Sequence, residues 1–185
     1  MAQPQIQNIM STFDVGCRLK LAYIARNCPN TEYNPSKFNP VIMRFKEPKS
    51  TALIFGSGKV VVTGTKDEDV SRSVARRYVN VIRKVGIPAR FLNFRITNIV
   101  ASCQLNFRPP LFDKNFLPPS KMKYVDYTPE LFPGLIYRSD VTIILFRSGK
   151  VIITKGKTRQ QIYDAYRIFE KSINNRGVCE EEETS

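Results

Sequence analysis

β-Branched and aromatic residues are concentrated in two stretches of the chain, residues 41–63 and 135–154, and each stretch contains a Ser-Gly-Lys turn. Such residues favour extended structure, and a short glycine-containing turn between two extended segments is typical of an antiparallel hairpin. Successive side chains of a strand point to opposite faces of the sheet. The pattern therefore predicts an antiparallel sheet in both halves of the chain.

Each stretch is followed by apolar residues at helical spacing, which predict an amphipathic helix. The stripe of the first helix consists of Val70, Val74, Tyr78, Val81, Ile82 and Val85. Thr65 and Glu68 have the spacing of a capping box at its start. The stripe of the second helix consists of Ile162, Tyr166, Phe169 and Ile173, with Thr158 and Gln161 as the predicted cap pair. A shorter helix is predicted over Leu19–Asn27, and its counterpart over residues 112–123 contains two prolines, which disfavour a helix.

The two halves repeat each other in order, which is the signature of an internal duplication. VIMRFKEPKSTALIFGSGK in the first half corresponds to LIYRSDVTIILFRSGK in the second, and a Tyr-x-Pro-x-x-Phe segment precedes each. Further upstream, Gln-Asn-Ile-Met corresponds to Thr-Asn-Ile-Val, and the offset between copies stays between 90 and 94 residues. We predict a first repeat over residues 1–88, a second over 89–179, and an acidic tail over 180–185.

Side-chain parity predicts that the sheet of each repeat has one face that is not covered by the helices. The helices must bury their apolar stripes against the opposite face. The other face of the first repeat carries Asn8, Met10, Thr12, Leu53, Phe55, Val61 and Thr63. Its counterpart carries Asn98, Val100, Ser102, Ile144, Phe146, Ile152 and Thr154. A face with apolar, aromatic and short hydrogen-bonding side chains is typical of a binding surface.

Charge and composition narrow the class of partner. The 185 residues include 29 Lys+Arg against 16 Asp+Glu, a formal net charge of +13, which favours a polyanionic partner. The sequence has no His, and its four Cys lack CxxC spacing, so we expect no catalytic residues, no metal site and no cofactor. The apolar runs are too short to span a membrane, and no secretory signal is visible.

Several motifs closely resemble the TATA-box-binding protein (TBP) family over residues 5–173, among them EYNPSKF, ALIFGSGKVVVTG and PELFPGLIYR. The resemblance implies an α+β saddle of two quasi-identical repeats, with one curved ten-stranded antiparallel sheet and helices on its convex face. It also implies a nuclear, non-enzymatic general transcription initiation factor that binds and bends A·T-rich DNA through the minor groove and nucleates preinitiation-complex assembly. The groove geometry is taken from the family and not from the residues.

The family pattern assigns the contacts with DNA. Base-edge contacts fall to Asn8, Asn98, Thr63, Thr154, Met10, Val61, Val100, Ile152, Leu53 and Ile144. The minor groove offers acceptors at A·T pairs, to which amides and hydroxyls can donate, whereas apolar side chains leave a guanine amino group unpaired. The intercalating pairs are Phe38 with Phe55 and Phe132 with Phe146. Phosphate contacts fall to Arg44, Lys59, Lys66, Arg138, Lys150 and Lys157.

Other positions match protein-docking surfaces of the family. Arg72, Arg76 and Arg83 lie on one outer helix face, which is either solvated or a docking surface for factors such as TFIIA. Glu130 and Leu131 belong to the segment that meets TFIIB. The resemblance further implies TBP-associated factors and the RNA polymerase machinery as partners, and it leaves open a homodimer of the free protein.

Three departures from the family keep a second function open. Met10 replaces the usual valine, Thr128 replaces the usual glutamate, and the second hairpin is three residues shorter than the first. The alternative is a TBP-related paralogue that acts mainly as a protein-interaction adaptor with weak or relaxed DNA specificity. The architecture also resembles a domain of some DNA glycosylases, but we find no catalytic Lys/Asp motif and predict no enzyme.

Overall fold

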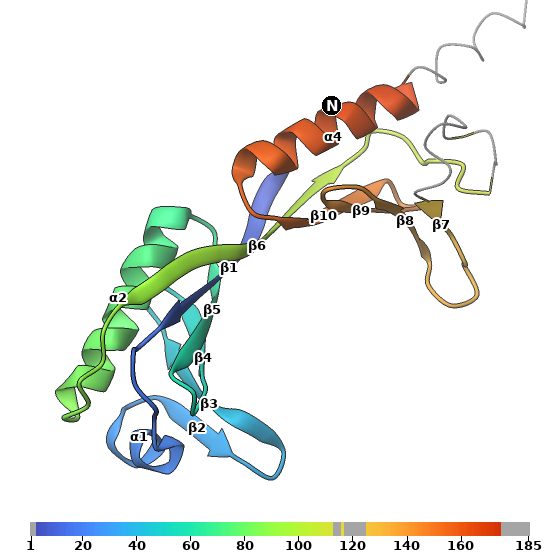
Figure 1. The fold of residues 1–185 in the computed structure, drawn as a ribbon. Coiled ribbons are helices and arrows are strands. Elements are labelled where there is room, and N and C mark those ends of the chain that lie inside the picture. Colours follow the sequence, from blue (N-terminus) through green and yellow to red (C-terminus); the bar gives the residue numbers. More distant parts are fainter. Residues whose placement is uncertain (1–2, 113–115, 117–124, 175–185) are drawn as a thin grey trace, which may run out of the picture. The chain divides into compact units, whose positions relative to one another are not determined.

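The computed structural model describes residues 3–112, 116 and 125–174. Ten strands form one antiparallel sheet in the order β2-β3-β4-β5-β1-β6-β10-β9-β8-β7 (Figure 1). The elements are β1 (Gln5–Asp14), α1 (Leu21–Asn27), β2 (Thr31–Asn34), β3 (Phe38–Phe45), β4 (Ser50–Ile54), β5 (Lys59–Thr65), α2 (Glu68–Lys84), β6 (Leu92–Gln104), β7 (Val125–Asp126), β8 (Gly134–Arg138), β9 (Thr142–Phe146), β10 (Lys150–Gly156) and α4 (Arg159–Asn174). Gln7–Asn98 form one compact unit, and the described residues of Met1–Ile6 and Ile99–Ser185 form the other.

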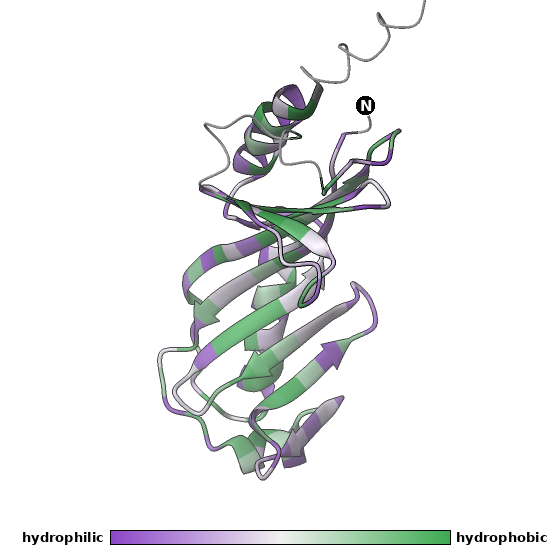
Figure 2. Cartoon of the chain, turned by 90° about the vertical axis from the view of Figure 1, so that its right-hand side faces the viewer, coloured by the Kyte–Doolittle hydropathy of each residue, from purple (hydrophilic) through white to green (hydrophobic). Residues whose placement is uncertain are grey.

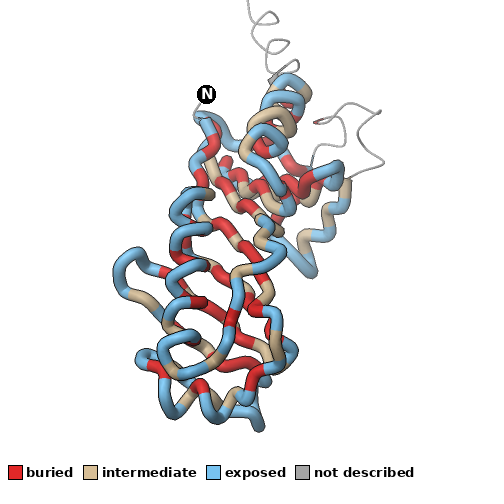
Figure 3. The backbone as a smooth tube through the Cα atoms, turned by 60° about the vertical axis from the view of Figure 1, so that its left-hand side comes forward, coloured by how far each residue is buried: buried red, intermediate tan, exposed pale blue. Residues whose placement is uncertain are grey.

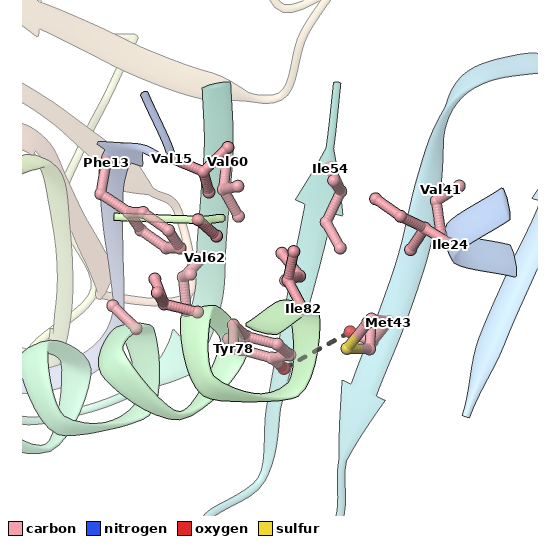
Figure 4. Close-up of a cluster of buried hydrophobic side chains, with 14 of the residues drawn as sticks. Phe13, Val15, Ile24, Val41, Met43, Ile54, Val60, Val62, Tyr78 and Ile82 are labelled. Atoms are coloured by element: carbon pink, nitrogen blue, oxygen red, sulfur yellow. Dashed lines mark hydrogen bonds between the residues drawn. The ribbon is translucent and has the colours of Figure 1, made fainter. Parts of the chain in front are cut away.

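In the first unit α2 covers one face of strands β1 to β5. The strand residues that face it are fully buried, as Val41, Ile54 and Val60 are in three neighbouring strands. Tyr78 of α2 reaches into this layer, where its hydroxyl donates to the Met43 carbonyl at 3.4 Å (Figure 4). The same hydroxyl lies 3.1 Å from the Ser50 hydroxyl. Burial raises the pKa of Tyr78 above its usual value. Of the predicted apolar stripe, Val74, Tyr78 and Ile82 are buried, Val81 and Val85 are half-buried, and Val70 is exposed. The short helix predicted over Leu19–Asn27 is found as α1, over Leu21–Asn27.

The cap predicted for the first helix is wrong. Asp67 is the N-cap residue, and its Oδ1 accepts hydrogen bonds from the N–H groups of Asp69 and Val70 at 2.9 and 3.1 Å. Thr65 is instead the last residue of β5, with its side chain buried and its hydroxyl without a hydrogen-bond partner in the described part of the chain. The physical reason is a β-bulge, because the register with β1 shifts between Val62 and Thr65 and turns Thr65 inward.

In the second unit α4 covers strands β6 to β10 in the same way. Its predicted stripe is buried: Ile162, Tyr166, Phe169 and Ile173. The predicted cap pair is confirmed, since Thr158 Oγ1 accepts from Gln161 N–H at 3.2 Å and Gln161 Oε1 accepts from Lys157 N–H at 2.8 Å. The helix considered over residues 112–123 lies outside the described residues except for Phe112 and Phe116.

Burial alternates along the strands of both units as the parity argument requires. Hydrophobic and polar residues follow one another along the strands (Figure 2), and buried segments alternate with half-buried ones (Figure 3). Ile9, Phe13, Ile99 and Ala101 face the helices with at most 2% of their surface exposed, whereas Asn8, Met10, Asn98 and Val100 are half-buried. No helix within the described ranges is long and apolar enough to span a membrane.

Candidate nucleic-acid interface

In the first unit the face away from α2 carries an apolar row on three strands, which ends at a threonine on a fourth. Ile42 of β3 pairs with Leu53, Leu53 pairs with Val61, and Val61 pairs with Thr12 of β1. The neighbouring row consists of Arg44, Thr51 and Thr63. Both rows remain partly open to solvent except at Thr12, which is 8% exposed. The register therefore gathers the predicted base-edge residues of the first repeat on one surface, which we call the first open face.

The second unit repeats this surface position by position. Its apolar row consists of Ile136, Ile144 and Ile152 and ends at Ser102, and the neighbouring row consists of Arg138, Thr142 and Thr154. The residues between them along each strand, such as Ile143 and Ile153, are fully buried under α4. This second open face therefore has the same layout as the first: one row is mainly aliphatic, and the neighbouring row consists of two threonines and one arginine.

Asn8 is held in a defined orientation on the first open face. Its Oδ1 accepts from the Gly64 backbone N–H at 2.8 Å and from the Thr63 hydroxyl at 3.1 Å, and its Nδ2 lies 2.9 Å from the same hydroxyl. Gly64 presents this N–H from the β5 bulge, with a φ of 99°. Because a backbone N–H can only donate, the acceptor end of the amide must face Gly64. The donor end of Asn8 is thus kept on the side of Thr63.

The equivalent asparagine, Asn98, lies beside Met10. Its Nδ2 lies 3.9 Å from the sulfur of Met10, and the adjacent Thr97 hydroxyl donates to the Met10 carbonyl at 3.2 Å. A thioether is a weak acceptor, so the contact with sulfur is easily exchanged for a better one. The Asn98 amide thus lies within reach of the Met10 side chain.

The two predicted phenylalanine pairs lie at one end of their hairpins. The Phe132 and Phe146 rings contact each other edge to face, with centroids 5.9 Å apart, and Phe132 is 38% exposed. Gly134 lies beneath them, and a Cβ there would come within 2.7 Å of Phe132 Cε1 and 2.8 Å of Ile144 Cγ2. In the first unit Phe38 is 47% exposed and Phe55 is half-buried. All four rings are thus accessible at the margins of the open faces.

The arginines predicted to contact phosphate have carboxylate partners at matching positions. Arg44 pairs with Glu32 of the edge strand at 2.9 Å, and Arg138 pairs with Asp126 of the other edge strand at 3.4 Å. Such exposed pairs stabilise a protein by at most about 1 kcal/mol, so they would not prevent contact with a polyanion. The predicted lysines are all exposed: Lys59, Lys66, Lys150 and Lys157.

The arginines on the outer face of α2 contact other residues of the chain in addition to solvent. Arg72 lies over the Phe94 ring at 4.6 Å and Arg76 over the Phe91 ring at 4.7 Å, while Arg83 donates to the Ala89 carbonyl at 2.6 Å. These arginines therefore pack on the segment that follows the helix and remain exposed. Glu130 and Leu131 are exposed as well, and the Leu131 side chain is 86% exposed.

Sequence reasoning missed several residues of the open faces. Ile42 and Ile136 complete the apolar rows, and strand parity applied to β3 and β8 could have found them. Arg95 lines a cavity of about 460 Å³ together with Thr12, Lys59 and Asn93. No sequence motif marks Arg95, because its neighbours come from three different strands. No group of His, Cys, Asp and Glu within the described ranges could hold a metal ion.

The chain has clear relatives. The family described as "Transcription factor TFIID (or TATA-binding protein, TBP)" matches residues 3–85 and 93–175. TATA box-binding protein-like 2 of Rattus norvegicus is 51% identical over 166 residues, which cover 88% of this chain and 47% of that protein. The TATA-box-binding protein of Acanthamoeba castellanii is 49% identical, with 88% of this chain and 63% of that protein covered. The chain thus spans about half to two thirds of the length of these relatives.

A solved structure agrees with these matches. Methanococcus jannaschii TBP superimposes with a TM-score of 0.77 and 29% identity, covering 94% of this chain and 99% of that one. The chain therefore belongs to the TBP family. The predicted α+β fold of two repeats with a ten-stranded antiparallel sheet is confirmed. The family is one of transcription factors and not of enzymes, as predicted.

Proposed function

We propose that this protein is a general transcription initiation factor that binds and bends A·T-rich, TATA-like promoter DNA through the minor groove. The observation that carries this proposal is the pair of register-equivalent open faces, each with an asparagine, threonines, an aliphatic row and a phenylalanine pair. The relatives named as TATA-box-binding proteins support the same assignment. The protein would act in the nucleus, where the promoters of its eukaryotic relatives lie.

The residue types explain how the two faces would choose a site. Asn8 and Thr63 can donate to the acceptors that A·T pairs present in the minor groove. The aliphatic row of Leu53 and Val61 would bury a guanine amino group without a partner, which disfavours most G·C pairs. Thr154, Ile144 and Ile152 would do the same from the second open face. Because these side chains are uncharged, they contribute selection and little long-range attraction.

Affinity and bending would come from other residues. Phenylalanines inserted between base steps unstack them at a cost of a few kcal/mol per step, which is offset by the larger surface brought into contact. The exposed lysines and the arginines Arg44 and Arg138 would contact phosphates, and each contact makes binding weaker at higher salt. The open faces would therefore determine the sequence bound, and the basic margins would determine its salt dependence.

Promoter binding would also serve assembly of the preinitiation complex. We propose that Arg72, Arg76 and Arg83 on α2 contact a factor such as TFIIA, and that Glu130 with the highly exposed Leu131 contacts TFIIB. TBP-associated factors and the polymerase machinery would follow. The alternative, an adaptor with weak DNA binding, is favoured only if these protein contacts persist without selective DNA binding.

A combined gel-shift and bending assay tests the proposal. Wild-type protein should bind and bend a TATA duplex and should bind a G·C-substituted duplex at least about 100-fold more weakly. Phe38→Ala/Phe55→Ala should reduce both affinity and bend. Equal binding to both duplexes, together with unchanged binding by the double variant, would contradict the proposal. Co-purification with general factors in that case would support the adaptor function.

A further inference from the structure

Met10 breaks the equivalence of the two open faces at a base-reading position. The second repeat has Val100 there, as the shared Asn-Ile segments align. Both side chains are half-buried, and strand alternation places each of them on the open face of its repeat. Only Met10 brings a sulfur atom to this surface, and that sulfur already lies 3.9 Å from an amide donor, Asn98 Nδ2. The Met10 sulfur thus already has an N–H group within hydrogen-bonding distance.

The minor groove contains one kind of hydrogen-bond donor on its base edges, the amino group of guanine. A valine facing that group removes it from water and offers nothing in return, so a G·C pair is rejected. A methionine sulfur is a weak acceptor on a chain with three rotatable bonds. It can therefore turn toward a guanine amino group, which valine cannot do.

Asn98 makes this exchange complete. In the structure its amide donates to Met10. A G·C pair offers both a donor, the guanine amino group, and acceptors, guanine N3 and cytosine O2. When the amino group donates to the Met10 sulfur, Asn98 Nδ2 is released to donate to one of the acceptors. The contact between Asn98 and Met10 is thus replaced by two contacts with the base pair.

We propose that Met10 is a specificity-determining residue whose sulfur lets this protein accept one G·C pair within an otherwise A·T-rich site. The proposal rests on the proposed minor-groove function. The tolerance is confined to the base pair that Met10 and Asn98 face, because Val100 at the equivalent position of the second repeat has no acceptor. The aliphatic rows on both faces keep the remaining positions selective for A·T.

The test isolates the guanine amino group with inosine. An inosine–cytosine pair lacks that amino group and otherwise resembles a G·C pair, so the ratio of affinities for the two pairs reports the amino group alone. Duplexes carry one G·C or one I·C pair at each position of an A·T box in turn. Binding of the full chain is measured by fluorescence anisotropy for the wild type, Met10→Val, Met10→Leu and Val100→Met.

For the wild type we expect one position at which I·C is preferred over G·C by less than about threefold, with about tenfold or more at the others. Met10→Val and Met10→Leu should raise the ratio at that position to about tenfold, and the ratio cancels any change in affinity that is common to both duplexes. Met10→Leu keeps the size of the side chain and removes the acceptor. Val100→Met should create a second tolerant position.

Three outcomes would overturn the inference: equal ratios in the wild type and Met10→Val, tolerance retained in Met10→Leu, or no tolerant position at all. Failure of the proposed function looks different, because the wild type would then not prefer the all-A·T box over a scrambled duplex. Thermal melting of each variant shows that it is folded, so that a lost tolerance is not a lost structure.

Discussion

The first and second repeats end their outer hairpins in different ways. In the first, Phe45 stacks on Tyr78 at 4.1 Å, and Arg77 lies over Phe45 at 4.7 Å and donates to the Glu47 carbonyl. In the second, the turn is shortened, and Ser139 N–H donates directly to the Val141 carbonyl at 2.8 Å. Counted from the N-terminal cap of each helix, Ile168 of α4 corresponds to Arg77 of α2, and Ile168 is 53% exposed.

The pairing of the strands that carry the open faces is the same in spite of this difference. Arg138 pairs with Thr142 next to the short turn, and Gly134 pairs with Phe146 at the opposite end of the hairpin. The three missing residues are thus lost from the end remote from the phenylalanine pair, and the register of β8 with β9 is unaffected. The comparison teaches that strand register sets the open face, whereas the hairpin turns are free to vary.

The strongest test of this equivalence removes each phenylalanine pair. Phe38→Ala/Phe55→Ala and Phe132→Ala/Phe146→Ala should each weaken binding to an A·T duplex by about 30-fold or more and reduce the bend, since each removes two rings that would insert between base steps. Electrophoretic affinity and fluorescence-transfer bend measurements check this. Phe45→Ala, off the open face, is the control. A loss confined to the first pair would show that the shortened hairpin has disabled the second repeat.

Gly134→Ala sharpens the comparison, because the glycine lies under only the second pair. The new methyl group would displace the Phe132 and Phe146 rings, and overpacking of this kind costs about 1–3 kcal/mol of stability. Denaturant unfolding measures this cost, and the bend of bound DNA should fall as well. Gly56→Ala is the matched control, since its nearest neighbour would be 3.6 Å away. Equal behaviour of the two variants would mean that Gly134 does not support the ring pair.

A smaller effect is expected at the bulges, where Gly64 and Lys155 occupy equivalent positions. Both have left-handed backbones, with φ values of 99° and 69°. A side chain in this region costs about 1 kcal/mol or more, so Gly64→Ala should destabilise the protein and Lys155→Gly should stabilise it by up to about 1 kcal/mol. Thermal unfolding compares the two. Stabilisation by Gly64→Ala would contradict the assignment of a strained bulge in both repeats.

The smallest difference concerns the basic margins. Lys59→Ala and Lys150→Ala should each lower the slope of log affinity against log salt by about 1, without changing which sequence is preferred. Titrations of one A·T duplex at several salt concentrations measure the slope. If either substitution altered the preference for A·T over G·C, that lysine would be reading bases and the separation between faces and margins would be wrong.

Much of the fold follows from the sequence because the repeat and the strand parity are both local patterns. Ile9 and Asn8 fall on opposite faces as predicted, and the stripe of α4 is buried as predicted. The cap predicted at Thr65 is wrong because a β-bulge keeps Thr65 paired in the strand, and the capping-box spacing of the sequence does not reveal a bulge.

The features that sequence reasoning missed depend on pairing between distant segments. The ion pairs of Arg44 with Glu32 and of Arg138 with Asp126 need the register of edge strands that carry weak patterns of their own. The partners of Arg72 and Arg76, Phe94 and Phe91, come from the segment after the helix, whose path back over α2 is not visible as a periodicity. The same holds for the contact of Asn98 with Met10.

The most direct test of the central claim compares three duplexes that differ only in one box: all A·T, all I·C and all G·C. The account holds that two uncharged faces read and bend the minor groove, which is nearly alike in A·T and I·C boxes. Wild-type protein should bind and bend the A·T and I·C boxes similarly and the G·C box at least about 100-fold more weakly. Equal rejection of the I·C and G·C boxes would contradict it, because those two boxes share the major-groove edge and not the minor-groove one.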